Sequence, residues 1–314
     1  MSRAYVRLLG TCTIQFDDCP PHDLGAGKLQ ELFCYLLFHR EQPHARETLA
    51  GMLWADSTSA QSKKYLRQAL WQLQSSLDQY ATTSARLLLV DSASVQLNPG
   101  ADLWLDVTEF EQACLLVQGI QASHITPARF AQLQKALDLY CGDLLPGWYQ
   151  EWCLYERERL INMYLMLLDK LMLYCEANHE YDTGLVYGTR ILGYDRAREC
   201  THRRMMRLYY LAGDRTGALH QFNHCVATLS AEFDAKPAQS TLDLYRQIHD
   251  DSFVGQSTRR APATKQATAL KSTYAIFQDQ LSQIYDVVTA LQHQVLKHMQ
   301  TLEALDQQRS SDIE

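Results

Sequence analysis

The sequence lacks the features that mark membrane-spanning and secreted proteins. Its longest apolar runs, such as YLLF and LLLV, are far shorter than the roughly 20 residues that cross a bilayer. The N-terminus has no apolar signal-peptide segment. The nine cysteines are odd in number and form no CxxC pair, so we expect reduced and mostly buried thiols. These absences predict a soluble protein of the cytoplasm that does not contact a membrane.

Motifs for catalysis and cofactor binding are also missing. The chain has no nucleophile elbow, zinc-protease motif or dinucleotide fingerprint. His220, His224 and Cys225 have a spacing that could contribute to a metal site, but no fourth ligand accompanies them, and surface histidines are the better interpretation. We therefore predict no catalytic residue, no cofactor and no metal, and a protein that is not an enzyme.

The chain has no excess of positive charge. Residues 1–100 hold 9 basic and 9 acidic side chains, residues 101–254 hold 14 and 21, and residues 255–314 hold 6 and 6. The net charge of −7 therefore arises in the middle of the chain. A neutral DNA-binding region has little long-range attraction to phosphates, since each one it neutralises adds only about 0.9 to the salt slope. We expect one copy to bind DNA weakly and to need a second copy or another DNA-bound protein.

What the sequence does contain is a helix-turn-helix pattern between Arg46 and Leu77. Apolar residues recur at spacings of three and four along both predicted helices, at Leu49, Met52, Leu53, Leu66, Ala69, Leu70, Leu73 and Leu77. Burying this stripe turns the other side of the second helix outward. That side and its flanks carry cations, amides, an aromatic ring and a hydroxyl: Lys63, Lys64, Arg67, Gln68, Trp71, Gln72 and Ser75. Such groups can reach phosphates and base edges, so we predict a DNA-reading helix.

Two of these assignments have plainer alternatives. On an isolated helix, Lys63, Lys64 and Arg67 would form an ordinary solvated face. Trp71 could stack on a sugar or contact a thymine methyl group, but it could also pack against a neighbouring domain. The surrounding elements favour the DNA-binding interpretation for the cations.

The elements around this pattern predict a winged helix over residues 1–105. YVRLLG and CTIQF have strand composition and are separated by a single Thr. A helix is expected from Lys28 to Arg40, ahead of Pro43. RLLLVD and SVQLN then flank Ser92 and Ala93 as a short hairpin, and the strand signal continues in DLWLD.

Residues 106–251 predict an all-helical domain. Seven helical segments follow one another, over 108–119, 126–140, 151–177, 181–193, 196–212, 215–233 and 239–250. YDTGLVYGTRIL and DRTGALHQFNHCVATL share a pattern of Gly, Leu, an aromatic residue and a later Leu, about 33 residues apart. That interval is typical of tetratricopeptide-like helix pairs, whose concave surface usually holds proteins.

The end of the chain predicts a linker over 252–268 and a coiled-coil helix over 269–308. The linker is small, polar and Pro-containing. The helix carries an apolar stripe at alternating spacings of four and three, interrupted only by His298, at Leu270, Tyr274, Phe277, Leu281, Ile284, Val288, Leu291, Val295, Leu302 and Leu305. We expect this stripe to join copies of the chain, although it could also fold back on the helical domain or bind another protein.

Taken together, residues 3–250 resemble the bacterial transcriptional regulators of the Streptomyces antibiotic regulatory protein type. The resemblance is carried by RLLG, KLQELFCYLLFHR, LAGMLW and YLRQALWQLQSSL, and then by DVTEFE, LYCGDLLPGWYQEW, ERERL, ECTHRRMMRLYYLAGDRTGAL and PAQSTLDLYRQI. It implies an OmpR-like winged helix joined to a bacterial transcriptional activator domain. It also implies promoter binding, typically to direct repeats, through the helix from Ser59 to Gln79, with residues 91–94 as the wing. This chain departs from the family at Gln72 and Gln74, where arginines are common.

The sequence therefore predicts a mainly α protein made of an α+β winged helix, a tetratricopeptide-like domain and a coiled-coil helix. The expected function is sequence-specific transcriptional activation, with promoter DNA, RNA polymerase and further copies of the chain as partners. The competing hypothesis is a protein-interaction scaffold whose winged helix has lost its affinity for DNA.

Overall fold

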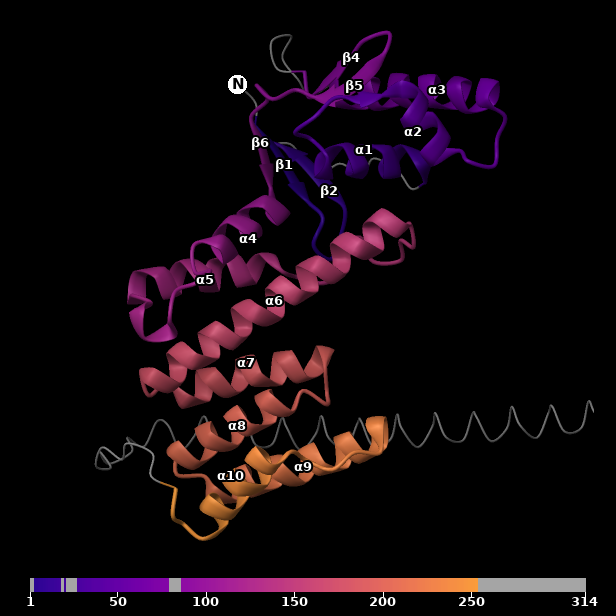
Figure 1. The fold of residues 1–314 in the computed structure, drawn as a ribbon. Helices are drawn as coiled ribbons and strands as arrows, with labels where there is room; N and C mark the ends of the chain where they lie inside the picture. The colour runs from indigo at the N-terminus through magenta and orange to yellow at the C-terminus, as the bar shows by residue number, and fades with distance from the viewer. Residues whose placement is uncertain (1–2, 18–19, 21–26, 79–85, 254–314) are drawn as a thin grey trace, which may run out of the picture. The chain divides into compact units, whose positions relative to one another are not determined.

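The computed structural model of the chain describes residues 3–17, 20, 27–78 and 86–253 (Figure 1). These residues belong to one compact unit that ends at Gly255. The predicted coiled-coil helix over 269–308 lies outside the described residues, and so does the predicted linker except for Ser252 and Phe253. No helix of the described part is long and apolar enough to cross a membrane.

The chain opens with a three-stranded sheet. Strands β1 (Ala4–Arg7) and β2 (Thr13–Phe16) pair antiparallel, as the sequence predicts, with Val6 opposite Ile14. The third strand, β6 (Leu103–Leu105), comes from the DLWLD run and pairs parallel to β1. This run therefore belongs to the first sheet and not to the sheet of the hairpin that precedes it in the chain. The sheet therefore brings the two ends of the predicted winged helix together.

Three helices and a second small sheet complete the N-terminal region. The helices are α1 (Lys28–Phe38), α2 (Arg46–Leu53) and α3 (Ser59–Asp78). The predicted hairpin forms from β4 (Leu88–Val90) and β5 (Ser94–Leu97), and β5 also pairs with a two-residue strand, β3 (His44–Ala45), directly before α2. This arrangement confirms the winged helix.

The rest of the described chain is helical. One 3-10 turn, η1 (Ala122–His124), interrupts a succession of α-helices: α4 (Asp106–Leu115), α5 (Pro127–Leu139), α6 (Glu151–Ala177), α7 (Tyr181–Tyr194), α8 (Glu199–Leu211), α9 (Arg215–Phe233) and α10 (Gln239–His249). Each corresponds to a helix expected from the sequence. Helices α6 to α9 pack each against the next, which confirms a tetratricopeptide-like stack (Figure 1).

Glycines allow α7 to approach its neighbours closely. A Cβ atom on Gly188 would lie 2.7 Å from Cγ of Met205 in α8 and 2.8 Å from Cε of Met172 in α6. A Cβ atom on Gly184 would lie 2.9 Å from Cδ1 of Leu208. The Gly of the repeat pattern therefore has a packing role in α7, because a larger side chain would separate the helices.

The N-terminal sheet is attached to the helical region through buried backbone contacts. Asp106, at the start of α4, accepts the N–H groups of Leu8 (2.8 Å) and Leu9 (3.0 Å) through Oδ2 and that of Val107 (2.7 Å) through Oδ1. On the other side, Gly10 donates its N–H to the carbonyl of Asp143 at 3.0 Å. Gly10 has φ of 95°, a left-handed conformation that favours glycine.

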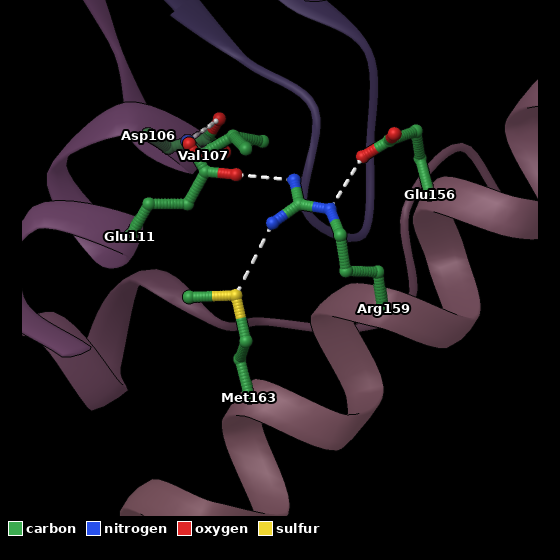
Figure 2. Close-up of polar contacts among 6 residues, drawn as sticks. All are labelled: Asp106, Val107, Glu111, Glu156, Arg159 and Met163. Carbon is green, nitrogen blue, oxygen red and sulfur yellow. Dashed lines mark hydrogen bonds and ion pairs between the residues drawn. The ribbon is translucent and has the colours of Figure 1, made fainter. Parts of the chain in front are cut away.

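Helix α6 extends this attachment with two arginines. Arg157 donates to the backbone carbonyls of Leu144 (2.8 Å) and Leu145 (2.6 Å), which fixes the loop that contacts Leu8 and Leu9. Figure 2 shows Arg159, whose guanidinium pairs with Glu111 of α4 and, at 2.8 Å, with Glu156. Together with Asp106, these side chains join α4 and α6 to the base of the N-terminal sheet.

The described cysteines are all free thiols. Cys34, Cys153, Cys175 and Cys225 are buried, whereas Cys141 and Cys200 are exposed. Burial raises the pKa of Cys175 to about 12. A thiol with so high a pKa stays protonated at neutral pH and is a weak nucleophile.

Candidate nucleic-acid interface

Helix α3 is fixed in place by its apolar side. Leu66, Leu70 and Leu73 are almost completely buried in the main core, which also contains residues of α1 and α2. Burying each of these side chains contributes about 1.5–3 kcal/mol, so the rotation of α3 about its axis is well determined. The ring of Trp54, which ends α2, lies 6.2 Å from that of Tyr65 in α3 and packs across the turn.

All seven candidate DNA-binding residues lie on the exposed side of the same helix. The structure places Lys63, Lys64, Arg67, Gln68, Trp71, Gln72 and Ser75 in α3 with exposed side chains. Trp71 keeps 68% of its surface exposed, which is unusual for so large an apolar side chain. The two faces predicted from the spacing of apolar residues are therefore present.

The three cations of this side differ in their electrostatic surroundings. Nζ of Lys63 lies 2.5 Å from Oε1 of Glu47 in α2, and this hydrogen bond lowers the pKa of the Glu47 carboxyl. No described residue forms an ion pair with Lys64 or Arg67. Lys64 and Arg67 consequently present an uncompensated charge to solvent, whereas the charge of Lys63 is partly balanced.

Sequence reasoning missed one cation of this region, Arg46. The first residue of α2 donates its backbone N–H to the carbonyl of Ala93 at 2.9 Å, and its Nη1 donates to the carbonyl of Asp91 at 2.8 Å. The hairpin tip has no cation of its own, but the fold brings one to it from 45 residues earlier in the chain. The signal that could have indicated this contact is the strand before α2, but a strand of two residues is too short to recognise from sequence.

The hairpin tip is closed by its own acidic residue. The carboxylate of Asp91 accepts the N–H groups of Ser94 (2.6 Å) and Ala93 (2.7 Å) and the hydroxyl of Ser94 (2.8 Å). These bonds, led by the one from the Ser94 N–H, lower the pKa of Asp91. An Asp that bonds the backbone two and three residues later is a common turn-forming device, and it was visible in the sequence.

The described residues offer no metal site. No group of three or more His, Cys, Asp or Glu side chains among them is arranged to hold a metal ion. Cys225 is buried, and the ring of His224 lies 5.6 Å from that of His202. His220 and His224 are exposed, as the surface interpretation predicts, and Cys225 packs with Ala197 and Leu229.

Comparison with known proteins identifies the helical domain. The fold is similar to that of Mycobacterium tuberculosis EmbR, solved in complex with a low affinity phosphopeptide, with a TM-score of 0.67 and 16% identity over 89% of this chain and 72% of that chain. Residues 105–249 match the family described as the bacterial transcriptional activator domain. Residues 105–249 thus form a bacterial transcriptional activator domain, and the two findings support the transcriptional regulator of the Streptomyces antibiotic regulatory protein type that the sequence predicts.

The domain match confirms the bacterial transcriptional activator domain predicted from the sequence. A further structural match, to the C-terminal tetratricopeptide-containing domain of an FK506-binding protein from Plasmodium falciparum, has a TM-score of 0.33 and 12% identity over 46% of this chain and 87% of that chain. A TM-score this low does not indicate a shared fold. No curated protein sequence matches the chain.

Proposed function

We propose that this chain is a cytoplasmic, sequence-specific transcriptional activator that inserts α3 into the major groove of promoter DNA. The observation that carries the proposal is the exposed side of α3, where Lys64 and Arg67 have no ion pair among the described residues. A buried apolar side keeps the helix in place while its outer side meets the duplex. Cations without internal partners favour phosphate and base contacts because binding breaks no existing ion pair.

In this proposal some of the charged and polar residues of α3 contact phosphates and others contact bases. Lys63, Lys64 and Ser75 contact phosphates, while Arg67, Gln68 and Gln72 carry the donors and acceptors that read base edges. Trp71 contributes an apolar contact from the same side. Arg46 holds the wing against α2 and places it beside the reading helix.

The helical domain is proposed to contact RNA polymerase. Residues 106–251 form the proposed activation domain, and the family matched over 105–249 is described as a transcriptional activator domain. Residues 1–105 form the proposed DNA-binding domain. Because Asp106 bonds directly to Leu8 and Leu9, docking of the N-terminal domain would also orient the helical stack beside the promoter.

Affinity is proposed to come from linked copies. The DNA-binding region has 9 basic and 9 acidic residues, so its long-range attraction to DNA is weak. Two copies on neighbouring sites, joined through the second domain or through the stretch 269–308, would bind more tightly because the second binding event is intramolecular. No enzymatic step enters this mechanism.

The test begins with a selection of duplexes bound by the purified full-length chain, followed by gel-shift titration at fixed salt. Arg67→Ala should weaken binding by about 1–3 kcal/mol, roughly five- to 150-fold, if Arg67 reads a base. Arg246→Ala on α10 removes another exposed guanidinium, one that pairs with Asp243, and should leave affinity unchanged. Selection of no duplex, with no protected site in a footprint, would support the scaffold hypothesis instead.

A further inference from the structure

The centre of the exposed side of α3 is chemically unlike its start. Lys64 and Arg67 carry charge, whereas Gln68 and Trp71, which lie one turn after Lys64 and Arg67 respectively, present an amide and an indole. Within the described part of the chain neither Gln68 nor Trp71 has a hydrogen bond or ring contact. Both side chains are therefore available to a ligand without the loss of any internal contact.

These two side chain types have defined partners in the major groove. The amide of Gln forms two hydrogen bonds with N6 and N7 of adenine, and apolar side chains contact the 5-methyl group of thymine. Guanine is instead read by Arg or Lys, which lie before this turn of α3. An aromatic ring has a large surface to bury, so a duplex that covers Trp71 with a methyl group gains more than one that leaves it in water.

The spacing of the two residues along α3 is compatible with contacts to neighbouring base pairs. Three residues advance about 4.5 Å along a helix axis at 1.5 Å per residue. Consecutive base pairs of B-DNA are about 3.4 Å apart. Gln68 and Trp71 lie three residues apart on the same side of α3, so they address neighbouring base pairs when the helix lies along the groove.

We propose that Gln68 and Trp71 together select two adjacent A·T pairs, with Gln68 on an adenine and Trp71 on the methyl group of a thymine. This inference rests on the proposed docking of α3 and specifies which duplexes it accepts. Lys64 and Arg67 hold the helix at the neighbouring backbone and base pairs. Trp71 is thus a specificity-determining residue, and its side chain acts through one apolar contact.

The experiment replaces thymine by deoxyuridine, which removes the 5-methyl group and nothing else. In a duplex selected with the full-length chain, each thymine is replaced singly and the affinity is measured by fluorescence anisotropy. Replacement at one thymine position of the site bound by each copy should weaken binding about fourfold, the value of one buried methyl-sized group. Trp71→Ala should bind the thymine and deoxyuridine duplexes equally.

A second substitution tests the adenine contact. Replacing the neighbouring adenine by 7-deazaadenine removes the N7 acceptor, and the resulting loss should disappear in Gln68→Ala. Tyr65→Ala serves as the matched control, because Tyr65 is an exposed aromatic residue of α3 that packs on Trp54 and lies off the outward line. This variant should keep the full difference between thymine and deoxyuridine.

The results separate this inference from the proposed function. If the wild type binds a selected duplex but is indifferent to every deoxyuridine, or if Trp71→Ala keeps the same preference, the A·T assignment is overturned and DNA binding stands. If Trp71→Ala leaves DNA affinity intact and lowers only transcription, Trp71 contacts a protein and the assignment is again overturned. If no duplex is selected, the proposed function itself fails.

Discussion

The carboxylate of Asp106 should be a main determinant of how firmly the N-terminal sheet is attached to the helical region. Asp106 is 2% exposed, and its Oδ2 accepts two backbone N–H groups from the end of β1. Asp106→Ala leaves these N–H groups without an acceptor in a buried place. We expect the free energy of unfolding to fall.

The size of the effect follows from two opposing contributions. Each buried N–H that loses its acceptor costs about 1–3 kcal/mol. Removing the buried charge offsets part of this lost stability. Burial of the charge is unfavourable, since it raises the pKa of Asp106 above its ordinary value of 3.8 in spite of the hydrogen bonds that the carboxylate accepts. We therefore expect Asp106→Ala to lose about 2–3 kcal/mol. Asp106→Asn keeps a carbonyl oxygen for Leu8 and Leu9 and should lose about half as much.

Urea unfolding followed by circular dichroism, at about pH 7 and about pH 5, measures both effects. Because the pKa of Asp106 is raised by folding, the folded state takes up the proton first, and this group adds stability as the pH falls from neutrality towards 3.8. Asp106→Asn should lack this gain. The reasoning is refuted if Asp106→Ala unfolds within about 0.5 kcal/mol of the wild type or if Asp106→Asn is the less stable variant.

Three further predictions test the packing, the buried histidine and the charges. Gly188→Ala should lower the free energy of unfolding in urea by about 1–3 kcal/mol, because the added methyl group would collide with Met205. Gly193→Ala, in open space on the same helix, should be neutral or stabilising. Equal effects of the two substitutions would contradict the close approach of α7. His202 is buried; its Nε2–H donates to the carbonyl of Arg196, and its Nδ1 accepts from the side-chain amide of Gln221. Burial lowers the pKa of His202 below 6.5, so the unfolded state binds the proton first and stability should be lost as the pH falls through 6.5. A His202→Gln variant that loses as much stability between about pH 7.5 and 5.5 would refute this cause. Lys64→Ala should reduce the salt slope of DNA binding by about 0.9. Lys63→Ala should reduce it by less, because Lys63 is bonded to Glu47, and Lys236→Ala should leave it unchanged. A larger reduction for Lys63→Ala than for Lys64→Ala would argue against the charge assignment.

The sequence was sufficient to predict the two faces of α3 because they depend on local periodicity. Leu66, Leu70 and Leu73 recur at helical spacing, and a helix that buries them must expose Gln68 and Trp71. The helices of the second region follow for the same reason. Their boundaries and their stacking order required little beyond the pattern of apolar residues and the repeat interval.

Contacts between residues far apart in the chain were not predictable in this way. The pairing of β6 with β1 and the bond from Arg46 to the hairpin tip join segments whose partners no local pattern identifies. The role of Asp106 likewise depends on Leu8 and Leu9, which directly follow β1 and lie almost a hundred residues earlier in the chain. The ion pair of Lys63 with Glu47 shows that equal charges on one helix face can have different surroundings, which a sequence does not reveal.

The central claim, that the outer side of α3 meets a duplex, is tested most directly by reversing its two unpaired charges. Binding of a selected duplex is measured by fluorescence anisotropy for Lys64→Glu/Arg67→Glu and for the matched pair Lys236→Glu/Arg246→Glu, with circular dichroism to verify folding. The account predicts that the first double variant is folded but loses specific binding, while the second binds like the wild type. Unchanged binding by the first variant, or equal loss by both, would contradict it.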